Sequence, residues 1–549
     1  MRRPSGGIPI AGDLPYQAGL LALTVAAVLL AIHHMPHSVW NDEGLTLNII
    51  HRERWQEVVQ GAMILKPFPP LFFFLTRVSE QMWPGHFGLR LVSLIFGILA
   101  LVAVYRLGKL LLGRWQGLLS ASLLVSTPGV FFHFVDANPY TILIFWSALS
   151  FELLARASDK SSKSIWIAYF LTALAGLASH SLFIFVLGGQ WLFYLHSQFC
   201  SKGDSRFFSV DFWKERTAFL FSVGLLLLCW AAWIVFYFRN QGLATGPRPD
   251  LLSVPTLVST IGLIPGPLTH SLWPHGAIFI VLLAAGVIRL WRFDATALTG
   301  LLLAWIPPAV GIALFAKATL PFISYRYGLG LFPITCLLAS CAALPSGHRT
   351  PSRARLLAAA APCIGFVTGF AVMAIAPSSY FTYSDWISCN RYLSAVAGPR
   401  DQIWFQNYQE AFPLEYYFGN PSRIVHFPYP QLASIPSSQY SAAQAEDLLK
   451  RHKAAGAEGG RIWVVEASFQ NMNPWIERFT RTGSSRLGRR LHEINRRLEA
   501  DGGLRLQRDR SFRRIQLYRL VRAVSAADCT DCTGPYNQCN LLFVKCKKL

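Results

Sequence analysis

The sequence predicts an α-helical polytopic membrane protein of about eleven transmembrane helices that carries a C-terminal soluble α/β domain. Of its 549 residues, 53% are hydrophobic and only 14% are charged, and the mean hydropathy is +0.36. This composition is too apolar for a soluble protein of that length. Long apolar segments recur up to residue 377, whereas residues 378–549 are much more polar.

The membrane crossings follow from apolar segments of roughly 17 to 25 residues. They are expected at residues 17–34, 86–111, 115–134, 139–157, 163–179, 181–199, 217–237, 275–292, 296–315, 324–345 and 355–377. The apolar segment 67–83 is not counted, because a crossing there would move the basic cluster between Arg106 and Arg114 to the other side of the membrane. We expect it to form an interfacial or re-entrant helix on the outer side.

The basic residues set the orientation of these crossings. With the N-terminus in the cytoplasm, every short loop on that side is basic, as the positive-inside rule requires. These loops contain Arg106, Lys109, Arg114, Arg156, Lys160, Lys163, Lys202, Arg206, Lys214, Arg216, Arg289, Arg292, Arg349, Arg353 and Arg355. The net charge of +21 is thereby explained by cytoplasmic loops and an anionic lipid surface, and nucleic acid is not an expected partner. We expect no cleavable signal peptide, since the first span lacks a small-residue cleavage site.

The domain organisation follows from this topology. Residues 1–377 form the transmembrane domain, whose long outer loops at 35–85 and 238–274 are expected to build the working cavity. Residues 378–525 form an outer α/β domain, because short apolar runs alternate there with helical stretches. The apolar runs are 402–405, 423–427 and 461–465, and the helical stretches are 441–456 and 484–500.

Residues 526–549 form an atypical tail that contains Cys529, Cys532, Cys539 and Cys546. Their spacing fits a zinc site or two disulfides, and an oxidising outer compartment favours disulfides. A disordered extension is the third alternative.

The first candidates for chemistry are the adjacent carboxylates Asp42 and Glu43, which directly follow the first apolar span. Carboxylates are costly to keep beside hydrocarbon, so we expect this pair to face water, a metal ion or a reacting hydroxyl. The structural alternative is that Asp42 caps a helix beginning near Gly44.

Other polar residues are expected at the same outer boundary. Asp136 and Tyr140 lie at the start of the fourth span, where Asp136 is either a structural anchor or a second acidic site residue, and His180 begins the sixth span. Lys66 and Arg326 lie among aromatic and proline residues that would restrict them, and Arg239 lies at the end of a span. Cations near carboxylates at a membrane boundary suit a phosphate-bearing lipid.

In order and spacing, these elements resemble the bacterial relatives of the protein O-mannosyltransferases. The matching elements are Asp42-Glu43, Lys66-Pro67 with Pro69-Pro70-Leu71, Phe87-Gly88-Leu89-Arg90-Leu91, Asp136 with Pro139-Tyr140, and Arg326-Tyr327. That group includes the aminoarabinose transferase of lipid A and the glycosyltransferases of lipopolysaccharide core, all of which have the GT-C fold. The resemblance covers about residues 15–345.

The resemblance implies an integral-membrane glycosyltransferase of the bacterial inner membrane. Such an enzyme transfers a sugar from a polyprenyl-phosphate donor to a glycan, lipid or protein acceptor on the outer face, normally with inversion. Asp42 is then the general base, Glu43 its partner in orienting the acceptor or a divalent ion, and Lys66 and Arg326 the donor-phosphate ligands. A divalent cation, if one takes part, would bind Glu43 or Asp136.

Two further points bear on this function. The family's acidic-Ala-Arg element appears here as Asp136-Ala137-Asn138, which puts a charge interaction at Asn138 in doubt. The alternative function is a transporter or flippase for lipid-linked substrates, but neither internal repeats nor ionisable residues near the midplane are evident. Glu152, near the cytoplasmic end of the fourth span, is the closest to an exception.

Overall fold

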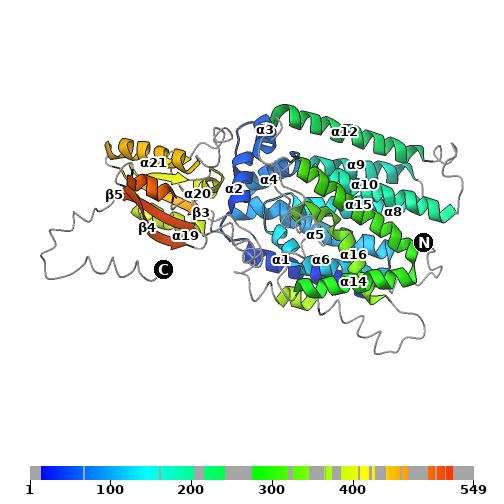
Figure 1. Ribbon diagram of the computed structural model, residues 1–549. Coiled ribbons are helices and arrows are strands. Elements are labelled where there is room, and N and C mark those ends of the chain that lie inside the picture. Colours follow the sequence, from blue (N-terminus) through cyan, green and yellow to red (C-terminus); the bar gives the residue numbers. More distant parts are fainter. Residues whose placement is uncertain are drawn as a thin grey trace. The chain divides into compact units, whose positions relative to one another are not determined.

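Long apolar helices make up the first part of the chain, and a five-stranded sheet makes up the second (Figure 1). The two parts are separate compact units, Met1–Thr382 and Tyr383–Leu549. The computed structural model describes residues 14–65, 68–159, 162–202, 216–241, 275–319, 325–344, 364, 366–371, 373, 385–405, 408–418, 423–426, 440–457, 460–467, 493–500, 504–512 and 515–522. The four cysteines of the predicted tail and nearly all of the loop 238–274 lie outside these residues.

The long helices of the first unit form a multi-pass membrane bundle. They are α1 (Leu14–His34), α5 (His86–Leu111), α6 (Arg114–Ser126), α8 (Tyr140–Asp159), α9 (Lys163–Ser179), α10 (Phe183–Lys202), α12 (Thr217–Gln241), α14 (His275–Phe293) and α15 (Ala295–Thr319). The late segment consists of η5 (Tyr325–Leu331), α16 (Phe332–Ser340) and η6 (Cys341–Ala343). Within the bundle α5 packs against α6 and α8, and α10 packs against α15.

Among the described residues, seven helices are long and apolar enough to cross a membrane, or eight if one bent pair counts as a single span. Helix α9 is apolar but has only 17 residues. Most of the predicted crossing at 355–377 lies outside the described residues, so the count of eleven stays a prediction.

The segment predicted as one crossing at 115–134 is broken. Helix α6 ends at Ser126, and α7 (Pro128–Phe131) with η2 (Phe132–Phe134) continues at an angle of 69°. The cause is Pro128, because a proline disfavours helical backbone at the residue before it, and Thr127 is extended with ψ 110°. The turned segment leads directly into residues 135–139.

Three short helices follow α1 at one end of the bundle (Figure 1): α2 (Asn41–Ile50), α3 (Trp55–Leu65) and α4 (Leu71–Met82). Helix α4 has 12 residues and a length of about 18 Å, which is too short to cross a hydrocarbon core. The apolar segment 67–83 is therefore not one continuous crossing helix.

Glycines allow α5 and α6 to approach closely. A Cβ atom added to Gly108 of α5 would lie 2.7 Å from the Cα of Gly117 in α6. Small residues at such a crossing let two backbones make van der Waals contact, which drives helix association where water is absent.

The second unit is a mixed sheet of order β2-β1-β3-β5-β4. Its strands are β1 (Gln402–Phe405), β2 (Ile424–His426), β3 (Ile462–Ala467), β4 (Leu504–Phe512) and β5 (Ile515–Arg522), and β1 is parallel to both β2 and β3. The three predicted apolar runs thus form the three parallel strands. Strand β5 joins this parallel part to β4 through antiparallel pairing on both of its sides.

Helices lie on both faces of this sheet. Ile403 and Phe405 of β1 pack in one apolar cluster with Trp386 of α19 (Trp386–Val396) and Leu414 of α20 (Tyr408–Tyr417). The intervening Trp404 faces a second cluster with α21 (Tyr440–Ala457) and the helix at 493–500. This alternation is what a strand buried on both faces requires.

Asp401 ties the start of β1 to β3. Its carboxylate accepts hydrogen bonds from the backbone N–H groups of Gly398 and Arg461, at 3.0 and 2.9 Å, and from the Trp463 indole at 2.9 Å. The guanidinium Nε of Arg461 donates a further bond at 3.0 Å. Burial alone would raise the pKa of Asp401, but these hydrogen bonds together lower it.

We expect Asp401→Ala to destabilise the second unit by about 1–3 kcal/mol, because it leaves buried donors unsatisfied. Hydrogen exchange of the β1 and β3 amides in the full-length protein would measure this. Glu493→Gln is the control, since its partners Arg496 and Arg497 are exposed. Because the pKa of Asp401 is lowered by folding, its contribution should be complete above the ordinary Asp pKa and should be lost as the pH falls below it. Equal protection in the two variants would contradict this role.

Candidate active site

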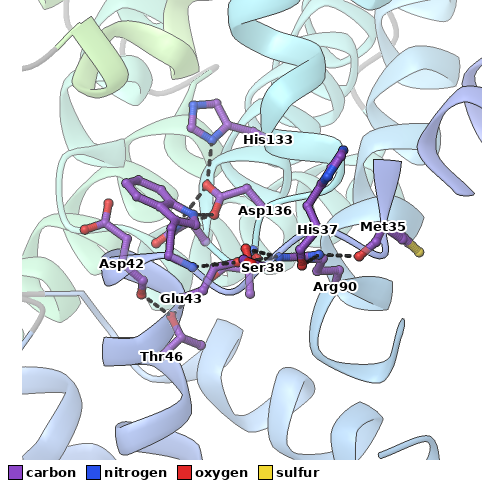
Figure 2. Close-up of polar contacts among 12 residues, drawn as sticks. Met35, His37, Ser38, Asp42, Glu43, Thr46, Arg90, His133 and Asp136 are labelled. Carbon is purple, nitrogen blue, oxygen red and sulfur yellow. Dashed lines mark hydrogen bonds and ion pairs between the residues drawn. The ribbon is translucent and has the colours of Figure 1, made fainter. Parts of the chain in front are cut away.

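The carboxylates Asp42 and Glu43 lie in the first turn of α2 and point in different directions (Figure 2). The helix begins at Asn41 with Trp40 as its N-cap, so Asp42 is not the cap of a helix starting near Gly44. Adjacent helix residues do not share a face. One turn of helix therefore places the two carboxylates in different surroundings.

Glu43 is completely buried in a two-pronged ion pair with Arg90. Its Oε1 accepts from Arg90 Nε at 2.7 Å, and its Oε2 accepts from Arg90 Nη2 at 2.6 Å. The backbone N–H groups of Ala137 and Trp40 also donate to it, at 3.0 and 3.4 Å. Burial raises the pKa of Glu43, and the charge and hydrogen bonds of Arg90 oppose that increase.

Arg90 also holds the connection between α1 and α2. From the first turns of α5 its guanidinium donates to the backbone carbonyls of Met35, His37 and Ser38 (Figure 2). The side chain is fully buried. A buried charge needs such saturation by partners, because an unpaired guanidinium would be very costly there.

Asp136 fixes the segment after η2 against α2. Its Oδ1 accepts from the Trp40 indole at 2.8 Å, and its Oδ2 accepts from His133 Nδ1 at 3.1 Å. The Asn138 amide donates to both oxygens, at 2.7 and 2.8 Å. Thr46 adds a hydrogen bond of 2.9 Å to the Ala137 carbonyl. The Asn138 side chain thus stabilises the Asp136 carboxylate by hydrogen bonding.

Asp42 forms an ion pair with Arg326 of η5, and this pair remains accessible. The Asp42 side chain is 27% exposed and that of Arg326 is 19% exposed, whereas Glu43 and Arg90 are both at 0%. The Arg326 guanidinium lies 5.6 Å from the Trp40 ring and 5.8 Å from the Tyr140 ring. The aromatic rings and the carboxylate together restrict its position.

Tyr140 connects this ion pair to the predicted His180. Tyr140 is the first residue of α8, and His180 lies between α9 and α10. The His180 ring is 6.1 Å from that of Tyr140 and 4.6 Å from that of Phe68. Burial lowers the pKa of His180 to about 3, so its ring is neutral.

The structure therefore gathers Asp42, Asp136, Tyr140, His180 and Arg326 at one end of the bundle. The buried Glu43 links the first turn of α2 to Arg90 and to the Ala137 backbone. Arg239 is exposed in the last turn of α12 and takes no part in the contacts described above. Lys66 lies outside the described residues.

The residues considered for a divalent cation do not fit that role. All four carboxylate oxygens of Glu43 and Asp136 accept hydrogen bonds from protein groups. In the described part of the chain, no group of three or more His, Cys, Asp and Glu side chains is placed to hold a metal ion.

Sequence reasoning missed three contributors to this site. Trp40 and His133 were not singled out, and Arg90 was noted without its partner Glu43, which lies 47 residues away. One signal was available for Arg90, because an arginine inside the apolar start of a span needs a buried counter-charge. His133 also had a local signal, because it lies three positions before Asp136. Trp40 contacts Asp136 across 96 positions, and nothing in the local sequence indicates that contact.

Comparison with known proteins gives a family match over part of the chain and a likeness in fold. Residues 67–236 match the family described as dolichyl-phosphate-mannose-protein mannosyltransferase. No curated protein matches the chain. Among solved structures, ArnT from Cupriavidus metallidurans in the apo state is 12% identical with a TM-score of 0.52, covering 92% of this chain and 98% of its own.

The structure of the same ArnT bound to undecaprenyl phosphate gives 11% identity and a TM-score of 0.51, covering 94% of this chain and 99% of that one. At such identity the likeness shows the fold. The resemblance noted in the sequence is confirmed: the chain is a multi-pass membrane protein with the GT-C glycosyltransferase fold.

Proposed function

We propose that this protein transfers a sugar from a polyprenyl-phosphate donor to an acceptor hydroxyl at the outer face of a bacterial inner membrane. The observation that carries the proposal is the accessible Asp42–Arg326 pair at one end of a GT-C bundle. It combines a candidate proton acceptor with a candidate phosphate ligand. The deeply buried Glu43–Arg90 pair beside it offers neither to a substrate.

Arg326 would bind the donor phosphate. A guanidinium matches the geometry of phosphate oxygens, and its position between Trp40 and Tyr140 limits the entropy lost on binding. Lys66 is expected to assist as a second cation. The ArnT structure with undecaprenyl phosphate supports a lipid phosphate as the ligand class.

Phosphate binding would also free Asp42 for catalysis. The guanidinium that neutralises Asp42 in the free protein would be shared with the donor, which leaves a carboxylate oxygen for the acceptor hydroxyl. As the acceptor oxygen attacks the anomeric carbon, Asp42 takes its proton. The bond between that carbon and the phosphate oxygen breaks, and the lipid phosphate leaves with the electron pair beside Arg326. Attack opposite the leaving group inverts the anomeric centre.

Glu43 would act as a positioning residue. Its hydrogen bonds hold the first turn of α2 against α5 and the Ala137 backbone, and Asp42 is the preceding residue of that turn. A small displacement of a catalytic group costs a large factor in rate. The Glu43–Arg90 pair therefore sets the place of Asp42.

The proposed sidedness rests on the basic loops, which favour a cytoplasmic N-terminus. With the expected odd number of crossings, the α/β unit would then lie outside the inner membrane. Acceptor classes to be tested are a cell-envelope glycan, a lipid and a protein.

Glu152, the ionisable residue that would favour a transporter, is buried and forms ion pairs with Arg106 and Arg156 at 3.0 and 2.6 Å. These ion pairs give Glu152 a structural role. A flippase would return the sugar on its original lipid carrier, so product analysis separates the two functions.

Loss of the general base should slow turnover without unfolding the protein. In reconstituted membranes, Asp42→Asn should lower kcat by about 10²–10⁴-fold. Glu57→Gln is the matched control, since that carboxylate on α3 pairs only with a surface arginine in the contacts described. Full sugar transfer by Asp42→Asn at normal expression would remove Asp42 from the base role.

Loss of the bidentate cation should affect both donor binding and the leaving group. Arg326→Lys keeps the charge but loses the two parallel N–H donors that a guanidinium presents to a phosphate. We therefore expect a higher donor KM and a lower kcat. Steady-state kinetics with varied donor would measure both. An unchanged donor KM together with an unchanged kcat would exclude Arg326 from the phosphate site.

Breaking the buried pair should reduce stability first. Glu43→Gln leaves Arg90 buried without its counter-charge, and we expect a loss of about 3–5 kcal/mol, measured as a lower Tm in detergent. Adding Arg90→Gln should recover part of that loss, because no unpaired charge then remains. Glu43→Gln with a normal Tm but no turnover would instead indicate direct contact with substrate.

A further inference from the structure

Four rings form a cluster beside the Asp42–Arg326 pair: Phe68, His133, Tyr140 and His180. The Tyr140 ring is central, at 4.6 Å from His133, 6.1 Å from His180 and 6.3 Å from Phe68. Arg326 lies 5.8 Å from the same tyrosine ring. Two histidines therefore flank one aromatic ring next to the proposed phosphate ligand.

The hydrogen bonding of His180 fixes its tautomer. Its Nδ1 accepts the backbone N–H of Leu182 at 3.2 Å, so the hydrogen of the neutral ring is on Nε2. His180 is fully buried, and its Nε2 has no hydrogen-bond partner among the described residues. His180 thus presents an unsatisfied donor.

The hydrogen bonding of His133 produces the opposite arrangement. Its Nδ1–H donates to Asp136 Oδ2 at 3.1 Å. Asp136 already accepts from Trp40 and Asn138, so its charge is stabilised without a protonated histidine. In the neutral ring Nε2 is therefore an acceptor, and this buried atom too lacks a partner within the described ranges.

The Nε2 atoms of His133 and His180 are two buried polar atoms beside the Tyr140 ring without hydrogen-bond partners among the described residues, and this is costly in the free protein. Each is worth about 1–3 kcal/mol of lost hydrogen bonding. Packing alone does not require this pair, because apolar side chains would fill the same space without that cost. A ligand with a hydroxyl acceptor and a hydroxyl donor would satisfy both, and an aromatic face with a few placed polar groups is the usual form of a small-molecule site.

We propose that His133, Tyr140 and His180 form the subsite for the sugar of the lipid-phosphate donor. His180 Nε2–H donates to one sugar hydroxyl oxygen, and His133 Nε2 accepts the hydrogen of another hydroxyl. The inference rests on the proposed function. It selects the donor sugar because the phosphate at Arg326 is bonded directly to that sugar, and Arg326 lies over the same Tyr140 ring.

Asparagine substitutions can test the two Nε2 atoms separately from the packing. An asparagine side chain ends near the position of histidine Nδ1, so His133→Asn can still donate to Asp136, and His180→Asn can still accept from Leu182. Both variants lack the Nε2 group. His196→Asn is the matched control, since His196 is a partly exposed histidine on α10 outside the ring cluster.

The measurement is binding of the full-length protein to two kinds of probe. One is undecaprenyl phosphate alone, and the other is a panel of undecaprenyl phosphates bearing glucose, mannose, galactose or 4-amino-4-deoxyarabinose. We expect the wild type to prefer at least one sugar-bearing lipid over the bare lipid phosphate. Each asparagine variant should lose about tenfold of that preference. Its affinity for undecaprenyl phosphate, and that of His196→Asn for both probes, should be unchanged.

Three results would overturn the subsite. They are a wild type that prefers no sugar-bearing lipid, asparagine variants that retain the full preference, and an equal loss for both probes, which would indicate a structural role. Failure of the wild type to bind any lipid phosphate would instead contradict the proposed function itself, and the subsite with it.

Discussion

The buried ion pair between Glu43 and Arg90 is the interaction on which the rest of the site depends. It joins the first turn of α2 to the first turns of α5, and its remaining hydrogen bonds hold the carbonyls of Met35, His37 and Ser38 and the Ala137 backbone. This one ion pair thus holds together α2, α5, the connection between α1 and α2, and the backbone at Ala137. Such a pair adds little net stability compared with apolar packing, but removing one member is severe because it strands the other.

Two adjacent carboxylates acquire different chemistry from this arrangement. Glu43 turns into the protein and is saturated by donors, whereas Asp42 turns toward the partly exposed Arg326. The difference comes from the helix, since consecutive residues do not share a face. The buried carboxylate holds the helix in place, and the accessible one is available to a substrate.

The features that could be predicted from the sequence are mainly those set by neighbouring residues, whereas most contacts between distant residues were not predicted. The three apolar runs at 402–405, 423–427 and 461–465 could be recognised as strands because a short run of β-branched and aromatic residues is a local property, whereas their parallel pairing was not predicted. The break at Thr127 was missed, although Pro128 gave a local reason for it. The contact of Trp40 with Asp136 spans 96 positions, and no pattern in the sequence indicates it.

By itself the sequence determined the membrane class, the order of the apolar segments and the unusual placement of Asp42-Glu43, because the cost of moving polar groups into hydrocarbon acts on each segment independently. Only the tertiary structure decided which carboxylate is buried, which arginine pairs with each, and which histidine nitrogens remain without partners. Those outcomes depend on the directions of side chains from helices far apart in the chain. A buried charge or hydrogen-bonding group is stabilised by the atoms that fill its shell, and folding alone brings those atoms together.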